Sequence, residues 1–279
     1  SCAYAEKLAQ ERGSTFVHPF DDLDIVAGQG SIAMEIVQEL PTVDYILAPV
    51  GGGGLITGVS TLAKMLNPKI KVIGVEPAAA PSMTMALASG EPVTLDSANT
   101  IADGTAVKRV GDRIFEYAKK NIDQMLTVED DELVGAFLDM VENHKMIVEN
   151  SGLLTVAALK QLDLKGKKAV AILSGGNMDV ITMSSIVQHG LIQRDRIFSA
   201  SVLLPDKPGQ LALVAQTIAD AQGNVIKLEH NQFVSINRNS AVELTITMEA
   251  FGTEHKNKII KSLKKAGYDP KMRNSTSVY

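Results

Sequence analysis

The sequence has little cysteine and few aromatic residues. Of its 279 residues, 1 is Cys, none is Trp and 4% are aromatic. The single cysteine, Cys2, cannot form a disulfide within the chain, and no motif around it would activate its thiol. We therefore expect an inert thiol in a cytoplasmic protein. The net charge of −5 and the scarcity of rings that stack on bases both argue against a nucleic-acid partner.

Other signatures are missing as well. No apolar run approaches the roughly 18 residues that a membrane-spanning helix needs, so we expect a soluble chain without a membrane partner. The motif G-x-S-x-G is absent, which excludes the common serine-hydrolase signature. The histidines show no metal-ligand spacing and have no cysteine partners, which argues against a zinc site; they stand at positions 18, 144, 189, 230 and 255.

The first part of the chain alternates short apolar runs with helical patterns. The apolar runs are continuous, as in strands that are buried on both faces of a sheet, and lie at 44–50, 71–76, 124–128 and 168–174. The helical patterns lie between and after them, at 55–66, 110–121, 130–145 and 152–162. This alternation predicts an α/β fold with an open parallel sheet and helices on both faces.

The remaining region has a different order of elements. From about Arg196 the pattern predicts strand, helix, strand, strand, helix and a short final strand, which is the ferredoxin-like β-α-β-β-α-β unit. Residues 190–196 are the expected hinge, so we predict two domains, 1–192 and 196–279. The last helix carries lysines that we expect on its solvated face, at positions 256, 258, 261, 264 and 265.

Four consecutive glycines, Gly51, Gly52, Gly53 and Gly54, follow the first apolar run in the stretch PVGGGGLITG. Glycines at a strand end let several amides point at one spot with no Cβ atom in the way. The helix that follows adds its positive N-terminal end. This loop therefore predicts a phosphate-binding site.

Three other interpretations of these glycines compete with a singly attached phosphate. A nucleotide P-loop is disfavoured because Val59 stands where that motif has lysine. A dinucleotide site would lack the third glycine of G-x-G-x-x-G, although Glu76 ends the next strand, where a ribose-binding acid would stand. A turn of purely structural use is the third interpretation. The cost argues against it, because each glycine costs roughly 1 kcal/mol in chain entropy.

A serine at the end of another strand supports pyridoxal phosphate as the ligand. Ser174 ends the run 168–174 and precedes Gly175 and Gly176. Its hydroxyl could donate to the nitrogen of a pyridine ring whose phosphate lies in the glycine loop. Unlike an aspartate, a neutral hydroxyl does not keep the ring nitrogen protonated. The resulting weaker electron sink suits β-elimination.

Five ordered blocks within residues 18–177 resemble the threonine dehydratases, also called threonine ammonia-lyases, of the fold-type II pyridoxal-phosphate enzymes. The blocks are HPFDDLDIVAGQGSIAMEI, PVGGGGLITG, VIGVEP, TIADGTAVKRVG and ILSGGN. The stretch 203–232 resembles an ACT domain, a regulatory module that binds small effectors, often amino acids. The resemblance implies the medium-length form of the enzyme, with one ACT domain after the catalytic domain, and a homo-oligomer.

The resemblance assigns roles in the cofactor site. It implies that the four glycines bind the cofactor phosphate and that Ser174 contacts the pyridine nitrogen. Glu149 matches a glutamate near the active site. Asn150 and Ser151 follow it where Gly-Ala or Pro-Ser is commoner.

The resemblance also suggests two sites outside the cofactor site. Glu76 matches a carboxylate that helps to bind a divalent cation in the related serine racemases, whereas Ser82 stands where an aspartate is expected. Gly209 and Asn224 match positions at which paired ACT domains approach an amino-acid effector. Turn residues without a ligand are the alternative interpretation of this second pair.

The Schiff-base lysine of the family is absent from this chain. In the family it lies in an S-F-K-x-R-G-A motif, which an S-A-G-N-H loop follows, both upstream of the matching region; neither occurs here. Lys64, Lys108 and Lys145 lie outside such a motif, and each is expected to be a helix-face or loop charge. We therefore expect no catalytic residue in this chain, which would be the C-terminal part of a longer enzyme and inactive alone.

The expected function is the conversion of L-threonine to 2-oxobutanoate and ammonia, with pyridoxal phosphate as cofactor, L-serine as a second substrate and an amino acid as regulator. One alternative is a sensor without catalysis, in which the ACT domain binds an amino acid and the glycine loop has lost its ligand. Within the enzymes, serine racemase is the alternative, and the ACT-like region argues against it.

Overall fold

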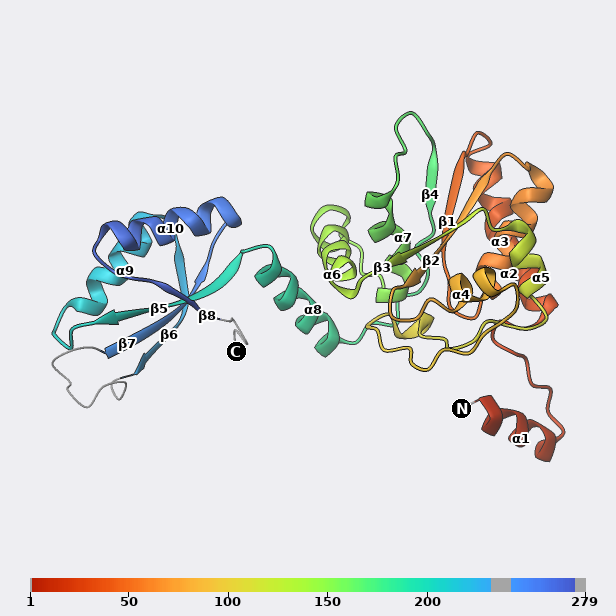
Figure 1. The fold of residues 1–279 in the computed structure, drawn as a ribbon, viewed down its shortest axis with the longest axis horizontal. Helices are drawn as coiled ribbons and strands as arrows, with labels where there is room; N and C mark the ends of the chain where they lie inside the picture. Colours follow the sequence, from red (N-terminus) through yellow and green to blue (C-terminus); the bar gives the residue numbers. More distant parts are fainter. Residues whose placement is uncertain (1, 232–241, 274–279) are drawn as a thin grey trace. The chain divides into compact units, whose positions relative to one another are not determined.

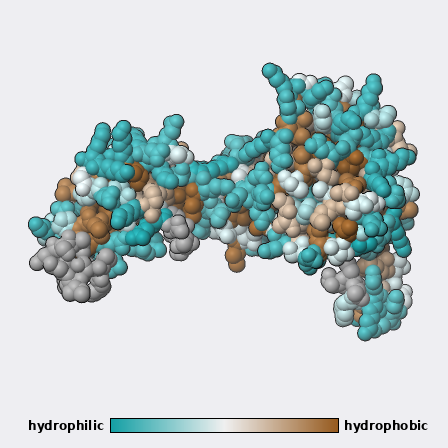
Figure 2. All heavy atoms as spheres, viewed as in Figure 1, coloured by the Kyte–Doolittle hydropathy of each residue, from teal (hydrophilic) through white to brown (hydrophobic). Residues whose placement is uncertain are grey.

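The computed structural model describes residues 2–231 and 242–273. These residues form two compact units, 1–179 and 180–279, each with its own elements (Figure 1). Among the described residues, no helix has both the length and the apolar character needed to cross a membrane. Figure 2 shows hydrophilic residues over most of the visible surface, with apolar atoms scattered among them.

The first unit contains the expected parallel sheet. Its strands are β1 (Tyr45–Pro49), β2 (Lys71–Pro77), β3 (Gln124–Val128) and β4 (Ala169–Ala171), in the order β3-β2-β1-β4. All three pairings are parallel. Residues of β1 and β2 are almost all buried, which explains why both strands are continuous apolar runs in the sequence. The prediction of an open parallel α/β sheet is confirmed.

Helices cover both faces of this sheet (Figure 1). Figure 1 shows α2, α3 and α5 on one side and α6 and α7 on the other, where α7 contacts β1, β2 and β3. The helices of the unit are α1 (Cys2–Arg12), α2 (Leu23–Glu39), α3 (Gly54–Leu66), α4 (Ser82–Ser89), α5 (Phe115–Asn121), α6 (Asp130–Asp139) and α7 (Asn150–Ala158). Three short helical turns complete it: η1 (Asp103–Thr105), the π-helical η2 (Met140–His144) and η3 (Leu159–Gln161).

The packing of α2 on α3 brings two backbones very close together. A Cβ atom on Gly58 would lie 2.3 Å from the carbonyl oxygen of Val26, so only glycine fits at that position of α3. From the other helix, Gly30 of α2 faces Gly58: a Cβ atom on Gly30 would lie 3.5 Å from the Gly58 carbonyl oxygen. Because α3 begins at the glycine loop, α2 helps to fix the position of that loop.

The second unit has the expected β-α-β-β-α-β order. After α8 (Val180–Gln193) come β5 (Ile197–Leu204), α9 (Gln210–Asp220), β6 (Asn224–Asn231), β7 (Val242–Glu249), α10 (Thr253–Lys265) and β8 (Lys271–Arg273). The strands form an antiparallel sheet in the order β6-β7-β5-β8. Residues 232, 240 and 241, expected at strand ends, lie outside the described residues.

The core of the second unit follows from the alternation of apolar residues in its strands. Alternate residues of β5 and β7 pack with Val214 and Ile218 of α9 and with Ile259 and Leu263 of α10. Four of the five lysines of α10 are exposed, as expected. Lys256 differs, because its Nζ lies 2.7 Å from an oxygen of Asp195 and is partly covered.

The junction between the units differs from the expected hinge. Residues 190–193 are the last turn of α8, and the amides of Arg194 and Arg196 bond back to the carbonyls of Gly190 and Leu191. The chain divides at Asp179, before α8, rather than after it. The assignment of the two parts as catalytic and regulatory domains stays a prediction.

Candidate functional site

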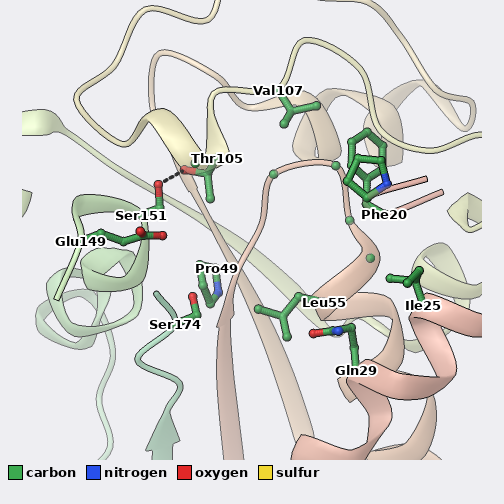
Figure 3. Close-up of a pocket in the computed structure, with 16 residues that line it drawn as sticks. Phe20, Ile25, Gln29, Pro49, Leu55, Thr105, Val107, Glu149, Ser151 and Ser174 are labelled. Carbon is green, nitrogen blue, oxygen red and sulfur yellow. Dashed lines mark hydrogen bonds between the residues drawn. The ribbon is translucent and has the colours of Figure 1, made fainter. Parts of the chain in front are cut away.

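A cavity of about 310 Å³ lies at the end of the parallel sheet where the strand runs end in glycines (Figure 3). This volume is at the lower end of the range of small-ligand pockets. Five segments that are far apart in sequence line it. They contribute Pro19, Phe20, Ile25 and Gln29; Pro49 to Leu55, except Val50; Gly104, Thr105 and Val107; Glu149 and Ser151; and Ser174.

The glycine loop lines this cavity and has backbone amides that bind no backbone carbonyl in the described residues. Within residues 2–231, no backbone carbonyl accepts a hydrogen bond from the amides of Gly51, Gly52 or Gly53. Gly53 has φ +100° and caps α3, whose first amides have no carbonyl within the helix to bind. A group of amides at a helix N-terminus favours an anion, and phosphate in particular. The phosphate site predicted from the four glycines therefore has the donors that it needs.

Helix α7 positions the loop that carries Ser174. A Cβ atom on Gly152 would lie 2.1 Å from the carbonyl oxygen of Ser174, so the helix backbone packs directly against this residue. Thr155 Oγ1 donates to the carbonyl of Ile172 at 2.9 Å, and an oxygen of Glu149 accepts from the Asn177 amide at 2.8 Å. These three contacts bracket Ser174 on both sides along the chain.

Glu149 is the one charged side chain among the described residues that line the cavity. Its carboxylate lies so close to Gly175 that a Cβ atom there would be 2.2 Å from Oε1. Beside it, the hydroxyls of Ser151 and Thr105 are 3.4 Å apart (Figure 3). Asn150, which is also buried, points elsewhere and donates to the Ile101 carbonyl at 3.0 Å.

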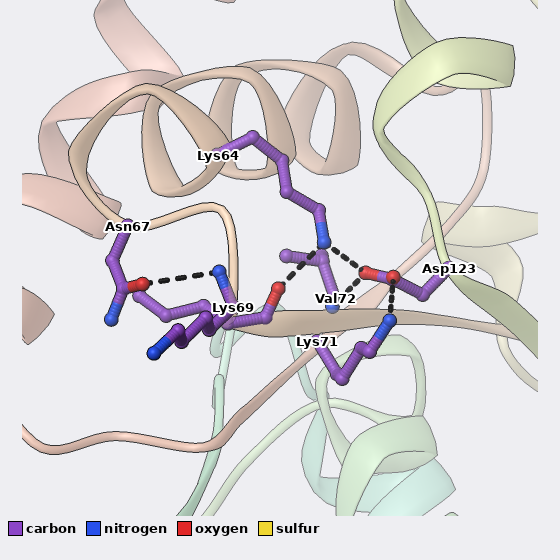
Figure 4. Close-up of polar contacts among 7 residues, drawn as sticks. Lys64, Asn67, Lys69, Lys71, Val72 and Asp123 are labelled. Atoms are coloured by element: carbon purple, nitrogen blue, oxygen red, sulfur yellow. Dashed lines mark hydrogen bonds and ion pairs between the residues drawn. The ribbon is translucent and has the colours of Figure 1, made fainter.

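None of the three lysines considered from the sequence lines the cavity. Lys64 donates to the carbonyl of Ile70 and pairs with Asp123, as Figure 4 shows. Lys108 donates to the carbonyl of Asp96, and Lys145 to that of Glu142. Each lysine therefore has a structural partner away from the site.

Glu76 caps a helix in this structure. It is fully buried, and its carboxylate accepts from the amide of Met83 at 2.6 Å and from the amide of Thr84 at 2.9 Å, both in the first turn of α4. Burial raises the pKa of Glu76 above its ordinary value, although the hydrogen bonds from Met83 and Thr84 lower it in part. In the part of the chain described, no group of three His, Cys, Asp or Glu side chains could hold a metal ion. The divalent cation stays a prediction, for which this geometry gives no support.

The two positions suggested for an effector lie at opposite ends of one helix. Gly209, with φ +89°, caps the start of α9, and Asn224 follows its end as the first residue of β6. The Asn224 amide group donates to Glu249 at 3.3 Å. A single copy of the chain therefore does not bring these two residues together, and the effector site stays a prediction.

Comparison with known proteins identifies the family. The model of the family described as pyridoxal-phosphate dependent enzyme matches residues 1–175. An L-threonine ammonia-lyase from Geobacter sulfurreducens is 41% identical over 269 residues, which are 95% of this chain and 67% of that protein. The chain belongs to the pyridoxal-phosphate dependent enzymes.

Solved structures agree with this family. A threonine deaminase isoform from Solanum lycopersicum is 36% identical, with a TM-score of 0.63 over 67% of this chain and 55% of that one. A serine racemase from Dictyostelium discoideum is 38% identical, with a TM-score of 0.59 over 64% of this chain and 58% of that one. This chain spans between about half and two thirds of the length of three of the curated relatives that it matches.

Membership in the family bears on the interpretations of the glycine loop, whose role in binding the cofactor stays a prediction. The cofactor is pyridoxal phosphate, which favours a singly attached phosphate over a dinucleotide or a purely structural turn. The residues present fit this cofactor, because free amides for a phosphate and a serine hydroxyl line one cavity. The sequence interpretation gave no role to Phe20, Gly104 and Thr105, although each lies in a block quoted for the family resemblance.

Proposed function

We propose that this chain forms the cofactor-binding part of a lyase that converts L-threonine to 2-oxobutanoate and ammonia, and L-serine to pyruvate and ammonia. The observation that carries the proposal is the cavity in which the glycine loop meets Ser174. The chain is 41% identical to an L-threonine ammonia-lyase, and this similarity supports threonine as the substrate.

In this proposal, different residues of the cavity bind different groups of the cofactor. The amides of the glycine loop bind the phosphate, and the Ser174 hydroxyl donates to the pyridine nitrogen. Bound pyridoxal phosphate supplies an electron sink for the electrons left when a substrate loses its Cα proton. Ser174, with a neutral hydroxyl in place of a carboxylate, would leave the ring nitrogen unprotonated and the sink weak, which suits a substrate with a β-hydroxyl leaving group. Glu149 fixes the Ser174 loop through the Asn177 amide.

Proton transfer at Cα needs a lysine that this cavity lacks. The described residues that line the cavity include no lysine, and the S-F-K-x-R-G-A motif does not occur in the sequence. We expect the 279-residue chain alone to bind the cofactor and to release no keto acid from threonine.

Regulation belongs to the second unit in this proposal. Its β-α-β-β-α-β topology supports an ACT-type module. Gly209 and Asn224, at opposite ends of α9, would meet an amino-acid effector only where two copies of the chain pair, which requires a homo-oligomer. The single cysteine fits a reducing compartment and supports a cytoplasmic location.

The test is keto-acid release from L-threonine with added pyridoxal phosphate. We would compare the chain alone with a longer version that also carries an S-F-K-x-R-G-A segment. Activity in the longer version only would support the proposal. Activity in the chain alone would show that one of its own lysines suffices, and activity in neither would favour the sensor.

Two alternatives have distinct signatures. A sensor without catalysis would bind an amino acid at the second unit and take up no pyridoxal phosphate in either version. A serine racemase would form D-serine from L-serine faster than pyruvate. The likeness to a Dictyostelium serine racemase is the observation that keeps this second alternative.

A further inference from the structure

The segment HPFDD, residues 18–22, forms a compact turn beside the glycine loop. His18 Nδ1 accepts from the Asp21 amide at 2.8 Å and from the Phe20 amide at 3.3 Å. Both amides therefore share one acceptor, the Nδ1 lone pair of the imidazole ring. Asp22 ends the turn by capping α2, where its side chain accepts from the Asp24 amide at 2.8 Å.

This turn places Phe20 in contact with Gly52 and Gly54 of the glycine loop. A Cβ atom on Gly52 would lie 2.2 Å from the Phe20 ring, and one on Gly54 would lie 2.9 Å from the Phe20 Cα. Figure 3 shows the Phe20 side chain directly beside the glycine loop. The ring of His18 packs edge-on against that of Phe20, with centroids 4.7 Å apart. Side chain and backbone of Phe20 therefore both contact the loop.

A second segment holds the glycine loop by its backbone, and Asp21 joins the two segments. The amide of Gly111 donates to the carbonyl of Gly52 at 3.0 Å. Asp21 Oδ1 accepts from the Arg113 amide at 2.9 Å, and a Cβ atom on Gly111 would lie 2.5 Å from the same oxygen. The loop is thus held between residues 18–21 and 111–113, which are tied to each other.

We propose that His18 and Asp21 are positioning residues for the phosphate site: they fix the conformation of Gly52 through Phe20 and Gly111, and so set how tightly the glycine loop holds a phosphate. The inference rests on the proposed cofactor site. Neither side chain lines the cavity, so each acts through its neighbours. Four glycines in a row have wide conformational freedom, and their amides converge on an anion only if other residues restrict them.

The test measures binding of pyridoxine 5′-phosphate and of pyridoxine to the full 279-residue chain by calorimetry. Neither ligand carries an aldehyde, so neither can form a covalent adduct with a lysine. The pair differs only in the phosphate. The variants are His18→Ala, which removes the acceptor, and His18→Asn, whose side-chain oxygen can accept the same amides. Asp21→Ala and Asp21→Asn form a second pair of the same design.

The expected result is a loss of phosphate-specific affinity in the alanine variants. His18→Ala and Asp21→Ala should weaken pyridoxine 5′-phosphate binding by about three- to tenfold, the effect of losing one or two hydrogen bonds. Pyridoxine binding should stay unchanged, and the asparagine variants should recover most of the loss. His255→Ala is the matched control, because His255 Nδ1 also accepts a backbone amide, that of Phe251, but in the second unit.

Different failures have different meanings. If the unchanged chain prefers the phosphorylated ligand and the alanine variants keep that preference, the positioning role is wrong and the cofactor site stands. Equal weakening of both ligands would also overturn it, because that pattern indicates a general loss of structure. If the unchanged chain shows no preference for the phosphate, the cofactor site itself is refuted, and this inference with it.

Discussion

At the residue scale, a substitution at Gly52 tests how closely the Phe20 ring packs against the glycine loop. Gly52→Ala should destabilise the chain by about 1–3 kcal/mol, because its Cβ atom would overlap the Phe20 ring and force one of them to move. Gly28→Ala is the control, since this exposed residue of α2 has open space around it and should stabilise by about 0.5–1 kcal/mol. Urea unfolding of both variants measures the difference. Equal effects of the two substitutions would contradict the close packing.

At the residue scale, the sequence is informative where a local pattern is unusual. Four glycines after a buried strand, and a serine at the end of another, are visible without any structure, and both line the cavity. Phe20 and Gly152 were not predicted to contact the site. Their importance comes from contacts with Gly52 and Ser174, which long-range packing alone creates.

At the scale of elements, Asp123, in the loop before β3, ties α3 to β2 (Figure 4). Its carboxylate pairs with Lys64 of α3 at 2.6 Å and with Lys71 of β2 at 2.8 Å, and accepts from the Val72 amide at 2.8 Å. Burial by itself would raise its pKa, but the hydrogen bonds from Lys64, Lys71 and Val72 outweigh this effect and hold the pKa below the ordinary value.

The pH dependence follows from that direction. Because the folded-state pKa of Asp123 is depressed, its contribution to stability is present above the unfolded value of about 3.9 and is lost as the pH falls through the folded value. Asp123→Asn should cost about 1–2 kcal/mol at pH 7, and this cost should shrink below about pH 4. Urea unfolding across this pH range measures it. Asp112→Asn, in an exposed pair with Arg109, should cost about 0–1 kcal/mol; the same loss in both variants would be evidence against the Asp123 network.

Glu76 gives a second prediction at this scale. Glu76→Ala should lower the unfolding free energy by about 2–4 kcal/mol, because the amides of Met83 and Thr84 at the start of α4 would lose their acceptor. If the carboxylate acts only as this cap, Mg²⁺ and a chelator should leave the melting temperature of the unchanged chain the same. A rise in melting temperature with Mg²⁺ that Glu76→Ala abolishes would restore the cation site.

Helices and strands could be predicted from the sequence where burial gives them a simple pattern of apolar residues. The strands β1 and β2 are apolar because both of their faces are covered, and the β-α-β-β-α-β order follows from regular alternation. Part of the expected hinge, residues 190–193, is helical here, since Gly190 is compatible with a helix when its neighbours supply the hydrogen bonds of α8. Local composition marks a possible break but does not decide it.

At the scale of the whole molecule, two separate cores imply two separable stabilities. One core lies around the parallel sheet and the other between the antiparallel sheet and the helices α9 and α10. The described division of the chain at Asp179 separates them. Calorimetry of the intact chain should therefore show two unfolding transitions rather than one.

Ligands should move these two transitions independently. A ligand at free concentration c stabilises the unit that binds it by RT ln(1 + c/Kd), so pyridoxine 5′-phosphate at about 100 times its dissociation constant should add roughly 2.7 kcal/mol to the first unit. The transition of the second unit should stay in place with this ligand and should rise instead with an amino-acid effector. We would assign each transition with Ala200→Asp, which places a charge in the core of the second unit and should abolish only its transition. A single transition that both ligands raise together would instead mean that the two units unfold as one, and effector binding would then stabilise the cofactor site through that shared unfolding.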